Sequence, residues 1–231
     1  MIYKEVEPDN LLTALVRHFW YFQNTTSNSL KYTVLPDGNV DLIIQIKNNQ
    51  LQSVDFYGIW AKQIEVEVGA ETTVWAVTFK PLASQYLFKK SIAHLLNSYE
   101  HLDFSTFGID SFLLNDFNDF VERITAFFLP LPKIDNRKID LFNALFDSNS
   151  SLTVEELSNQ LFWQSRQINR YFKAQFGLSV KAYANILRFF ASYTPIKAGN
   201  LSPNADFYDQ SHFIKEIKKH TGVNPTELFE N

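Results

Sequence analysis

The chain has 231 residues, a formal net charge of −4 and a hydrophobic fraction of 45%, with 22 Phe, 10 Tyr and 4 Trp. This length is comfortable for two domains, and so apolar a composition excludes an intrinsically disordered chain. There is no Cys, which excludes disulfides, thiolate metal sites and cysteine nucleophiles. No apolar run approaches the ~18 residues of a membrane span, and the start has no signal-peptide core, so we expect a cytoplasmic protein without membrane segments.

Residues 1 to about 80 are predicted to form mostly strands. Turn residues such as Pro36-Asp37-Gly38 separate the apolar runs, and one run alternates between apolar and acidic residues. Many short strands with turns between them indicate a barrel or sandwich-like sheet rather than βαβ units. The predicted strands are residues 12–22, 32–35, 40–46, 56–60, 64–68 and 73–79.

Helical patterns replace the strands after Pro81. We expect helices at residues 82–97 and 111–128, the second with a strong apolar stripe. A segment with two prolines and mixed charges follows and is a candidate linker. The predicted fold class is therefore α+β, with a mostly β domain that also carries helices at residues 1–132 and an all-α domain at residues 133–231.

The all-α domain is expected to open with a helix at residues 139–146 and then to form a helix-turn-helix. Thr153 is a candidate N-cap for a helix at residues 152–161. The short connection at residues 162–164 leads into a second helix, which ends at Gly177 because glycine favours the C-cap conformation.

The second of these helices has two contrasting faces. Ile168, Phe172 and Phe176 stand four residues apart and predict a buried apolar face. The opposite face has no carboxylate, and its side chains can bind guanine, adenine or phosphate. A solvated surface helix would show the same pattern. The residues of this face, predicted to contact DNA, are Arg166, Gln167, Asn169, Arg170 and Lys173.

Residues 152–183 resemble the first helix-turn-helix of AraC/XylS-type transcription regulators. Phe172-Lys173, Gly177-Leu178-Ser179 and Tyr183 stand where that family has its motif. Residues 207–225 resemble the signature of the family's second helix-turn-helix unit. The strand order before Phe79-Lys80-Pro81 also resembles the sensor domain found ahead of some AraC-type DNA-binding regions.

The resemblance implies a two-domain transcription regulator. Its two helix-turn-helix units, joined by a long helix that residues 183–193 resemble, would read successive major-groove faces of double-stranded DNA. The β-rich domain would sense a small-molecule effector or a partner and would carry a homodimer seam. Neither the motifs nor the resemblance implies an enzyme or a cofactor.

The second unit departs from the family pattern. Thr194-Pro195 is expected to break the long helix, Pro203 disfavours the unit's first helix, and Asp206 stands where the family has a turn glycine. We therefore expect an abbreviated or irregular first helix before an intact recognition-like helix at residues 209–220. Its predicted DNA contacts are Gln210, Ser211, His212, Lys215, Lys218 and Lys219.

The charge distribution leaves a second hypothesis open. From Ser150 onward there are nine Lys and Arg against seven Asp and Glu, whereas the preceding part has 12 against 18. This basic surplus suits a DNA-binding half but is small. The alternative is a protein-interaction module whose degenerate helix-turn-helix domain no longer binds DNA.

Aromatic strand residues suggest a ligand cavity, although plain core would look alike. The candidates are Trp20, Tyr57, Trp60, Trp75 and Phe79. The carboxylates of Asp37 and Asp41 are expected to cap a turn rather than act as an acid–base pair. No His pair has the spacing of helical metal ligands, and there is no GxGxxG, P-loop or GxSxG motif, so we predict no metal site and no catalytic residues.

Overall fold

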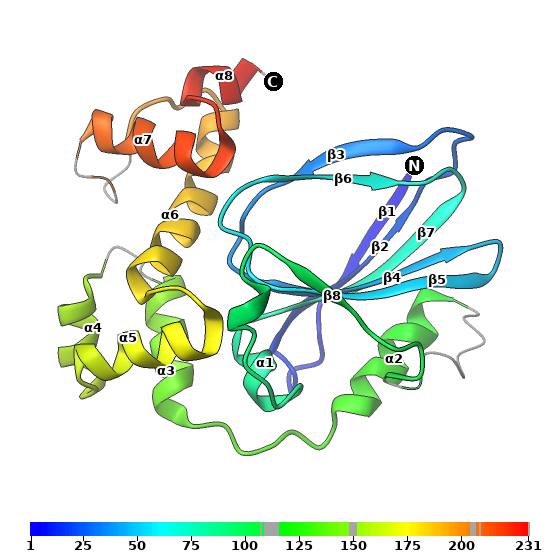
Figure 1. Ribbon diagram of the computed structural model, residues 1–231, viewed down its shortest axis with the longest axis horizontal. Coiled ribbons are helices and arrows are strands. Elements are labelled where there is room, and N and C mark those ends of the chain that lie inside the picture. The colour runs from blue at the N-terminus through cyan, green and yellow to red at the C-terminus, as the bar shows by residue number, and fades with distance from the viewer. Residues whose placement is uncertain (107, 109–115, 148–151, 204–206, 208, 231) are drawn as a thin grey trace.

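The computed structural model describes residues 1–106, 108, 116–147, 152–203, 207 and 209–230. A β-rich N-terminal part is followed by a helical C-terminal part (Figure 1), which confirms the predicted α+β fold class. Every strand pair of both sheets is antiparallel. The prediction of short strands without βαβ units is therefore confirmed.

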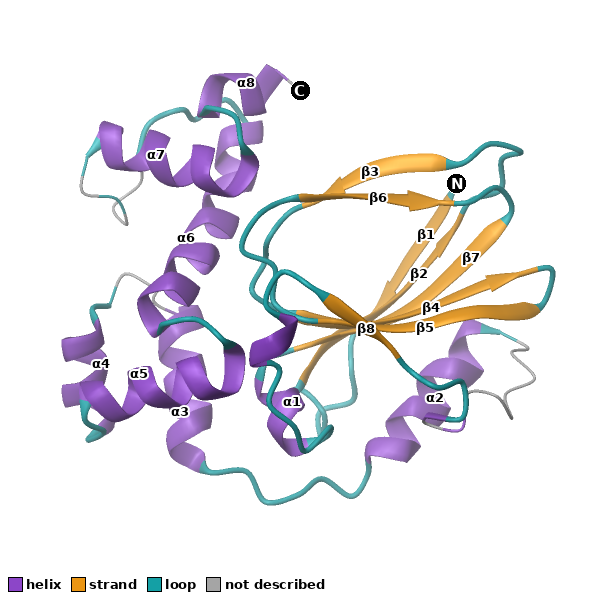
Figure 2. Cartoon of the chain, in the orientation of Figure 1, coloured by secondary structure: helices purple, strands orange, loops and turns teal. Residues whose placement is uncertain are grey.

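The strands form a six-stranded sheet, in the order β1-β2-β7-β4-β5-β8, and a separate two-stranded sheet, β3-β6. In Figure 2 the β3-β6 pair lies over one face of the large sheet and helix α2 lies against the other. Strands β1 and β8, at the two edges of the large sheet, were not predicted. The strands are β1 (Ile2–Val6), β2 (Val16–Gln23), β3 (Leu30–Val34), β4 (Val40–Lys47), β5 (Gln50–Tyr57), β6 (Ile64–Val68), β7 (Thr72–Phe79) and β8 (Tyr99–His101).

The large sheet buries its α2-facing side most completely. On β4, Val40, Leu42 and Ile44 are fully buried, while Asp41 and Ile43 between them are only partly buried. This alternation follows from the two-residue period of a strand. On the α2 side, rings of the sheet pack against Phe120 and Phe128 of α2 and form an aromatic core. A cavity in this part of the protein therefore lies on the other side of the sheet.

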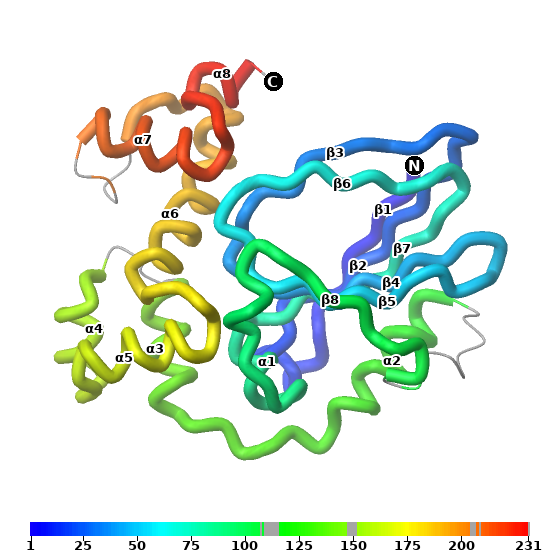
Figure 3. Tube along the Cα trace, in the orientation of Figure 1, coloured from blue at the N-terminus to red at the C-terminus, as the bar shows by residue number. Residues whose placement is uncertain are grey.

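The helices are α1 (Leu82–Tyr86), the 3₁₀ helix η1 (Ala93–Leu95), α2 (Phe117–Phe128), α3 (Asn136–Asp147), α4 (Val154–Leu161), α5 (Ser165–Phe176), α6 (Val180–Lys197), α7 (Gln210–Thr221) and α8 (Pro225–Glu230). Residues 129–135 form an extended connection from α2 to α3, visible as a long tube segment in Figure 3. The expected domain boundary after residue 132 falls in this connection.

Two helix predictions need correction. Residues 82–97 do not form one helix, because α1 ends at Tyr86 and Lys89 adopts a left-handed φ of 54°. Helix α6 continues through Pro195, which was expected to break it. Pro195 lies in the last turn, where the missing N–H removes one helical hydrogen bond and the helix ends two residues later. Residues 111–115 of the second predicted helix lie outside the described residues.

The two helix-turn-helix units are packed differently. The buried residues of the first unit, including Phe172 and Tyr183, belong to the same hydrophobic cluster as the core of the large sheet. The second unit has a smaller cluster of its own, centred on Phe189, Phe213 and Ile217. The first unit thus shares the core of the β-rich part, whereas the second unit, at the other end of α6, has a separate core.

Candidate nucleic-acid interface and effector cavity

The first helix-turn-helix begins with a capped helix. Thr153 Oγ1 accepts a hydrogen bond from the Glu156 backbone N–H at 3.2 Å, and Glu156 Oε2 accepts one from the Thr153 N–H at 2.7 Å. This reciprocal pair confirms Thr153 as the N-cap of α4. Phe162 is the C-cap of this helix, with a left-handed φ of 49°, and α5 begins three residues later at Ser165.

Helix α5 has the two faces that its sequence predicts. Ile168, Phe172 and Phe176 are all 0% exposed, and Gly177 ends the helix with a φ of +81°. On the opposite face only Asn169 is partly buried, and its side-chain amide donates to the Ser165 carbonyl at 3.3 Å. Within the described part of the chain, no ion pair involves a residue of this face. The exposed residues of the face are Arg166, Gln167, Arg170 and Lys173.

Helix α7 presents a more mixed surface. Asp209 caps it by accepting from the His212 backbone N–H at 2.7 Å, and Lys219 is paired with Glu216 at 3.0 Å. The ring of His212 is partly buried, and Gln210 donates to a backbone carbonyl. The remaining predicted contacts, Ser211, Lys215 and Lys218, are exposed.

The segment before α7 is not helical where it is described. Residues 199–203 contain no helix, as expected from Pro203. Asp206, the proposed replacement for a turn glycine, lies outside the described residues.

Both polar-faced helices are anchored by their C-terminal ends. At the end of α5, the Gln175 carbonyl accepts from the Ile92 N–H at 2.9 Å, and the Gln175 side chain donates to the Lys90 carbonyl at 2.7 Å. At the end of α7, the His220 carbonyl accepts from the Gln63 N–H at 2.8 Å. The sequence gives no sign of these contacts, because each joins segments far apart in the chain.

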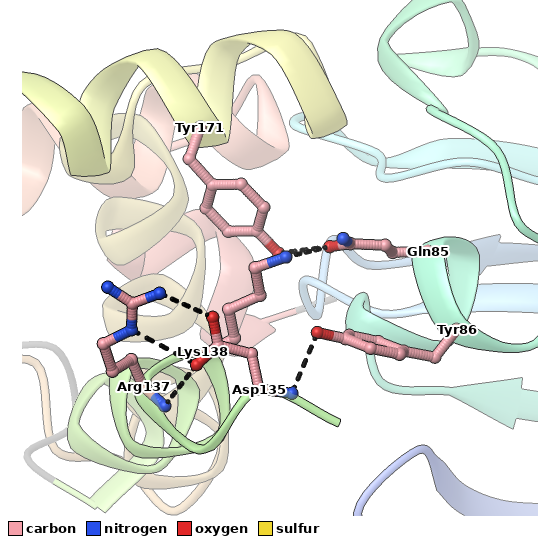
Figure 4. Close-up of polar contacts among 6 residues, drawn as sticks. All are labelled: Gln85, Tyr86, Asp135, Arg137, Lys138 and Tyr171. Carbon is pink, nitrogen blue, oxygen red and sulfur yellow. Dashed lines mark hydrogen bonds and ion pairs between the residues drawn. The ribbon is translucent and has the colours of Figure 1, made fainter. Parts of the chain in front are cut away.

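A polar junction also ties α5 and α3 to α1 (Figure 4). Gln85 Oε1 accepts from Lys138 Nζ at 2.9 Å and from the Tyr171 hydroxyl at 3.1 Å. Tyr86 accepts from the Asp135 backbone N–H at 3.0 Å. Lys138 Nζ also lies 4.9 Å from the centre of the Tyr171 ring, a cation–π distance. The junction therefore holds the start of the helical part against the β-rich part.

A cavity of about 910 Å³ lies between the large sheet and the β3-β6 pair. Three predicted ligand-pocket residues, Trp20, Tyr57 and Trp60, line it. Trp75 and Phe79 do not, and this part of the prediction needs correction. They face α2, where Trp75 lies 5.4 Å from the Phe120 ring and Phe79 lies 5.6 Å from the Phe128 ring. Strand parity places both on the opposite side of β7 from the cavity.

Asp41 has a different place from the one predicted from the sequence. It does not cap the turn, as Asp37 does by accepting from the Asn39 N–H at 2.9 Å. Asp41 lines the cavity, and its Oδ1 accepts from the Thr78 hydroxyl at 2.5 Å. Burial, followed by repulsion from Asp37, raises the pKa of Asp41 to about 7. Its position as the lone acid in the apolar strand Val40–Lys47 is the signal that could have identified it.

Neither a metal-binding cluster nor a membrane-spanning helix is present among the described residues. These contain no cluster of three or more His, Asp or Glu able to hold a metal ion. No described helix is long and apolar enough to cross a membrane.

Comparisons with known proteins identify similar chains. Residues 4–101 match a family described as a domain of unknown function (DUF6597). No curated protein matches. Among solved structures, ToxT from Vibrio cholerae O395 is 14% identical, with 98% of this chain and 95% of that chain covered and a TM-score of 0.42. Unsaturated fatty acid bound wild-type ToxT from Vibrio cholerae strain SCE256 is 13% identical over 98% and 93%, with a TM-score of 0.40.

Proposed function

We propose that the protein is a sequence-specific DNA-binding transcription regulator of the AraC type, modulated by a small molecule in its β-rich domain. The domains would be residues 1–132 and 133–231. One observation carries the proposal: two polar-faced helices, α5 and α7, lie at opposite ends of α6 (Figure 1), and each is anchored at its C-terminal end. Their N-terminal halves, which contact bases in helix-turn-helix proteins, remain available.

The length of α6 fits an arrangement in which α5 and α7 contact the same DNA duplex. Its 18 residues correspond to a length of about 27 Å. Successive major-groove faces of DNA lie about 34 Å apart. Helices packed on the two ends of α6 can therefore approach neighbouring turns of one duplex.

The two helices would contribute unequally. Helix α5 offers Arg166 and Arg170 for base or phosphate contacts, without a competing carboxylate on that face. On α7, Lys215 and Lys218 are suited to phosphate contacts, while Glu216 already holds Lys219. We assign base recognition mainly to the first unit.

The cavity is connected to α7 by one short segment. Trp60 and Ile64 line the cavity, and between them the Ala61 carbonyl lies 2.6 Å from His220 Nδ1. A ligand that moved Trp60 or Ile64 would therefore move an anchor of α7. Such a ligand regulates DNA binding only to the extent that it binds the two arrangements with different affinities.

Selection of bound fragments from sheared source-genome DNA by the full-length protein, at physiological salt, tests the proposal. We expect enrichment of a few sites that share a bipartite motif. Uniform, weak recovery both with and without added metabolite extract would contradict it.

Replacing Arg170 by Ala is expected to weaken binding to a selected site by about 1–3 kcal/mol, because it removes one base or phosphate contact. Titration of a labelled duplex with parent and variant measures this. Lys47→Ala is the matched control, since it removes the same charge from the β4-β5 end of the large sheet, away from the helical part. Equal binding by Arg170→Ala and the parent would remove α5 from the interface.

The protein-interaction module remains a second candidate, favoured by the small basic surplus and by the non-helical segment before α7. The salt dependence of association separates the two. DNA binding through several phosphates weakens steeply as salt is added, because counterions are released. Affinity for a protein partner that is insensitive to salt, without DNA affinity, would favour the module.

A further inference from the structure

The charges around the cavity are predominantly negative. The charged residues among its described lining are Met1, through its N-terminal ammonium, and Lys31, Asp41, Glu65 and Glu67. Lys31 Nζ lies 3.8 Å from Glu67, and the N-terminal ammonium of Met1 donates to the Thr25 hydroxyl at 3.0 Å. Three carboxylates thus stand against two cations in the described lining, which favours a cationic ligand over an anionic one.

Asp41 is the charged group best placed to meet a ligand. Trp20 Nε1 donates to Thr78 Oγ1 at 3.1 Å, and the Thr78 hydroxyl in turn donates to Asp41 Oδ1. Thr78 and Trp20 therefore hold the Asp41 carboxylate in place at the cavity wall. No described Lys or Arg forms an ion pair with Asp41. A partly buried carboxylate in this state lacks the cation that would normally compensate it.

Aromatic rings surround this carboxylate. Tyr57 is directly opposite Asp41 in the β4-β5 register, and its ring lies 6.5 Å from that of Trp60 and stacks at 4.8 Å on that of Tyr99. Trp20 also lines the cavity. The faces of such rings attract cations, and several rings around one carboxylate are suited to an ammonium group.

We propose that the cavity binds an organic ammonium ion with an aromatic or apolar body, whose charged nitrogen binds Asp41 while its body packs between the large sheet and the β3-β6 pair. This inference rests on the proposed function, in which the cavity is the effector site, and names the class of effector. The apolar residues Ile43, Val66 and Val74 would contact the body. A fatty acid or another carboxylate is expected to bind more weakly, because Asp41 would repel it.

Three probes of similar size test the class: 3-phenylpropylamine, 3-phenylpropan-1-ol and 3-phenylpropanoate. Each is titrated into the full-length protein at pH 8, followed by tryptophan fluorescence and calorimetry. The amine should bind at least about tenfold more tightly than the alcohol, and the propanoate most weakly. Asp41→Asn, which keeps the side chain's shape, should bring the amine's affinity down to that of the alcohol. Asp140→Asn, at an exposed position on α3, is the matched control and should keep the full preference.

Other outcomes contradict the proposal. Equal affinity for amine and alcohol, tighter binding of the propanoate, or an amine preference that survives Asp41→Asn would overturn the ligand class. A lack of binding by all three probes up to about 10 mM would overturn the cavity as a site for them. These titrations contain no DNA, so a failed fragment selection combined with a clear amine preference would reject the regulator and leave the ligand class standing.

Discussion

Gly177→Ala is expected to destabilise the protein by about 2–5 kcal/mol, far more than the same change at Gly222. Both glycines end a helix with a left-handed φ, +81° at Gly177 and +77° at Gly222. An alanine in this conformation costs about 1–2 kcal/mol at either site. A Cβ at Gly177 would also lie 2.6 Å from the Ala93 carbonyl oxygen of η1, whereas a Cβ at Gly222 meets nothing within 4 Å. The additional loss at Gly177 comes from crowding of two backbones that cannot both stay in place.

Denaturant unfolding of the two variants and the parent measures this difference. Gly222→Ala reports the cost of the backbone conformation alone, and the excess in Gly177→Ala reports the contact between α5 and η1. Equal losses would mean that this contact adds nothing to stability. Because Gln175 is anchored next to this contact, Gly177→Ala should also weaken DNA binding more than Gly222→Ala does.

Local features could be predicted from the sequence because their physical causes are local. Thr153 and Glu156 stand at capping-box spacing, and Gly177 follows the last residue of an apolar face. Each of these signals depends on a few neighbouring residues, and each marks a helix end in the structure. Local spacing likewise predicts which face of α5 is buried and which is exposed.

The remaining features depend on which elements pack against each face of the large sheet. Alternation in β7 shows that Trp75 and Thr78 lie on opposite faces, but not which face meets α2 and which meets the cavity. The role of Asp41 depends on Thr78, 37 positions along the chain. The contacts of Gln175 and His220 with the β-rich part are similarly remote. Such pairings follow from the tertiary arrangement, which local pattern does not specify.

Asp41→Asn is expected to stabilise the protein at pH 8 by about 2–4 kcal/mol, while the variant and the parent have similar stability at pH 4. The folded protein raises the pKa of Asp41 from an ordinary value of 3.8 to about 7, chiefly through burial. Between these values the folded state binds a proton that the unfolded state has released, so the stability of the parent falls as pH rises. Above about pH 7 the full cost of the buried charge remains. Asparagine carries no charge at any of these pH values and avoids it.

Unfolding curves from pH 4 to pH 8 provide the measurement, with Asp140→Asn as the control that removes an exposed carboxylate. The stability gap between Asp41→Asn and the parent should open between pH 4 and pH 7 and then stay constant. A gap of the same size at every pH would show that Asp41 is not held with a raised pKa. If the gap opens as expected, a saturating concentration of 3-phenylpropylamine at pH 8 should narrow or reverse it, because the bound cation compensates the carboxylate and stabilises only the parent. Asp41 would then be a residue that lowers the stability of the empty protein and provides its affinity for the ligand.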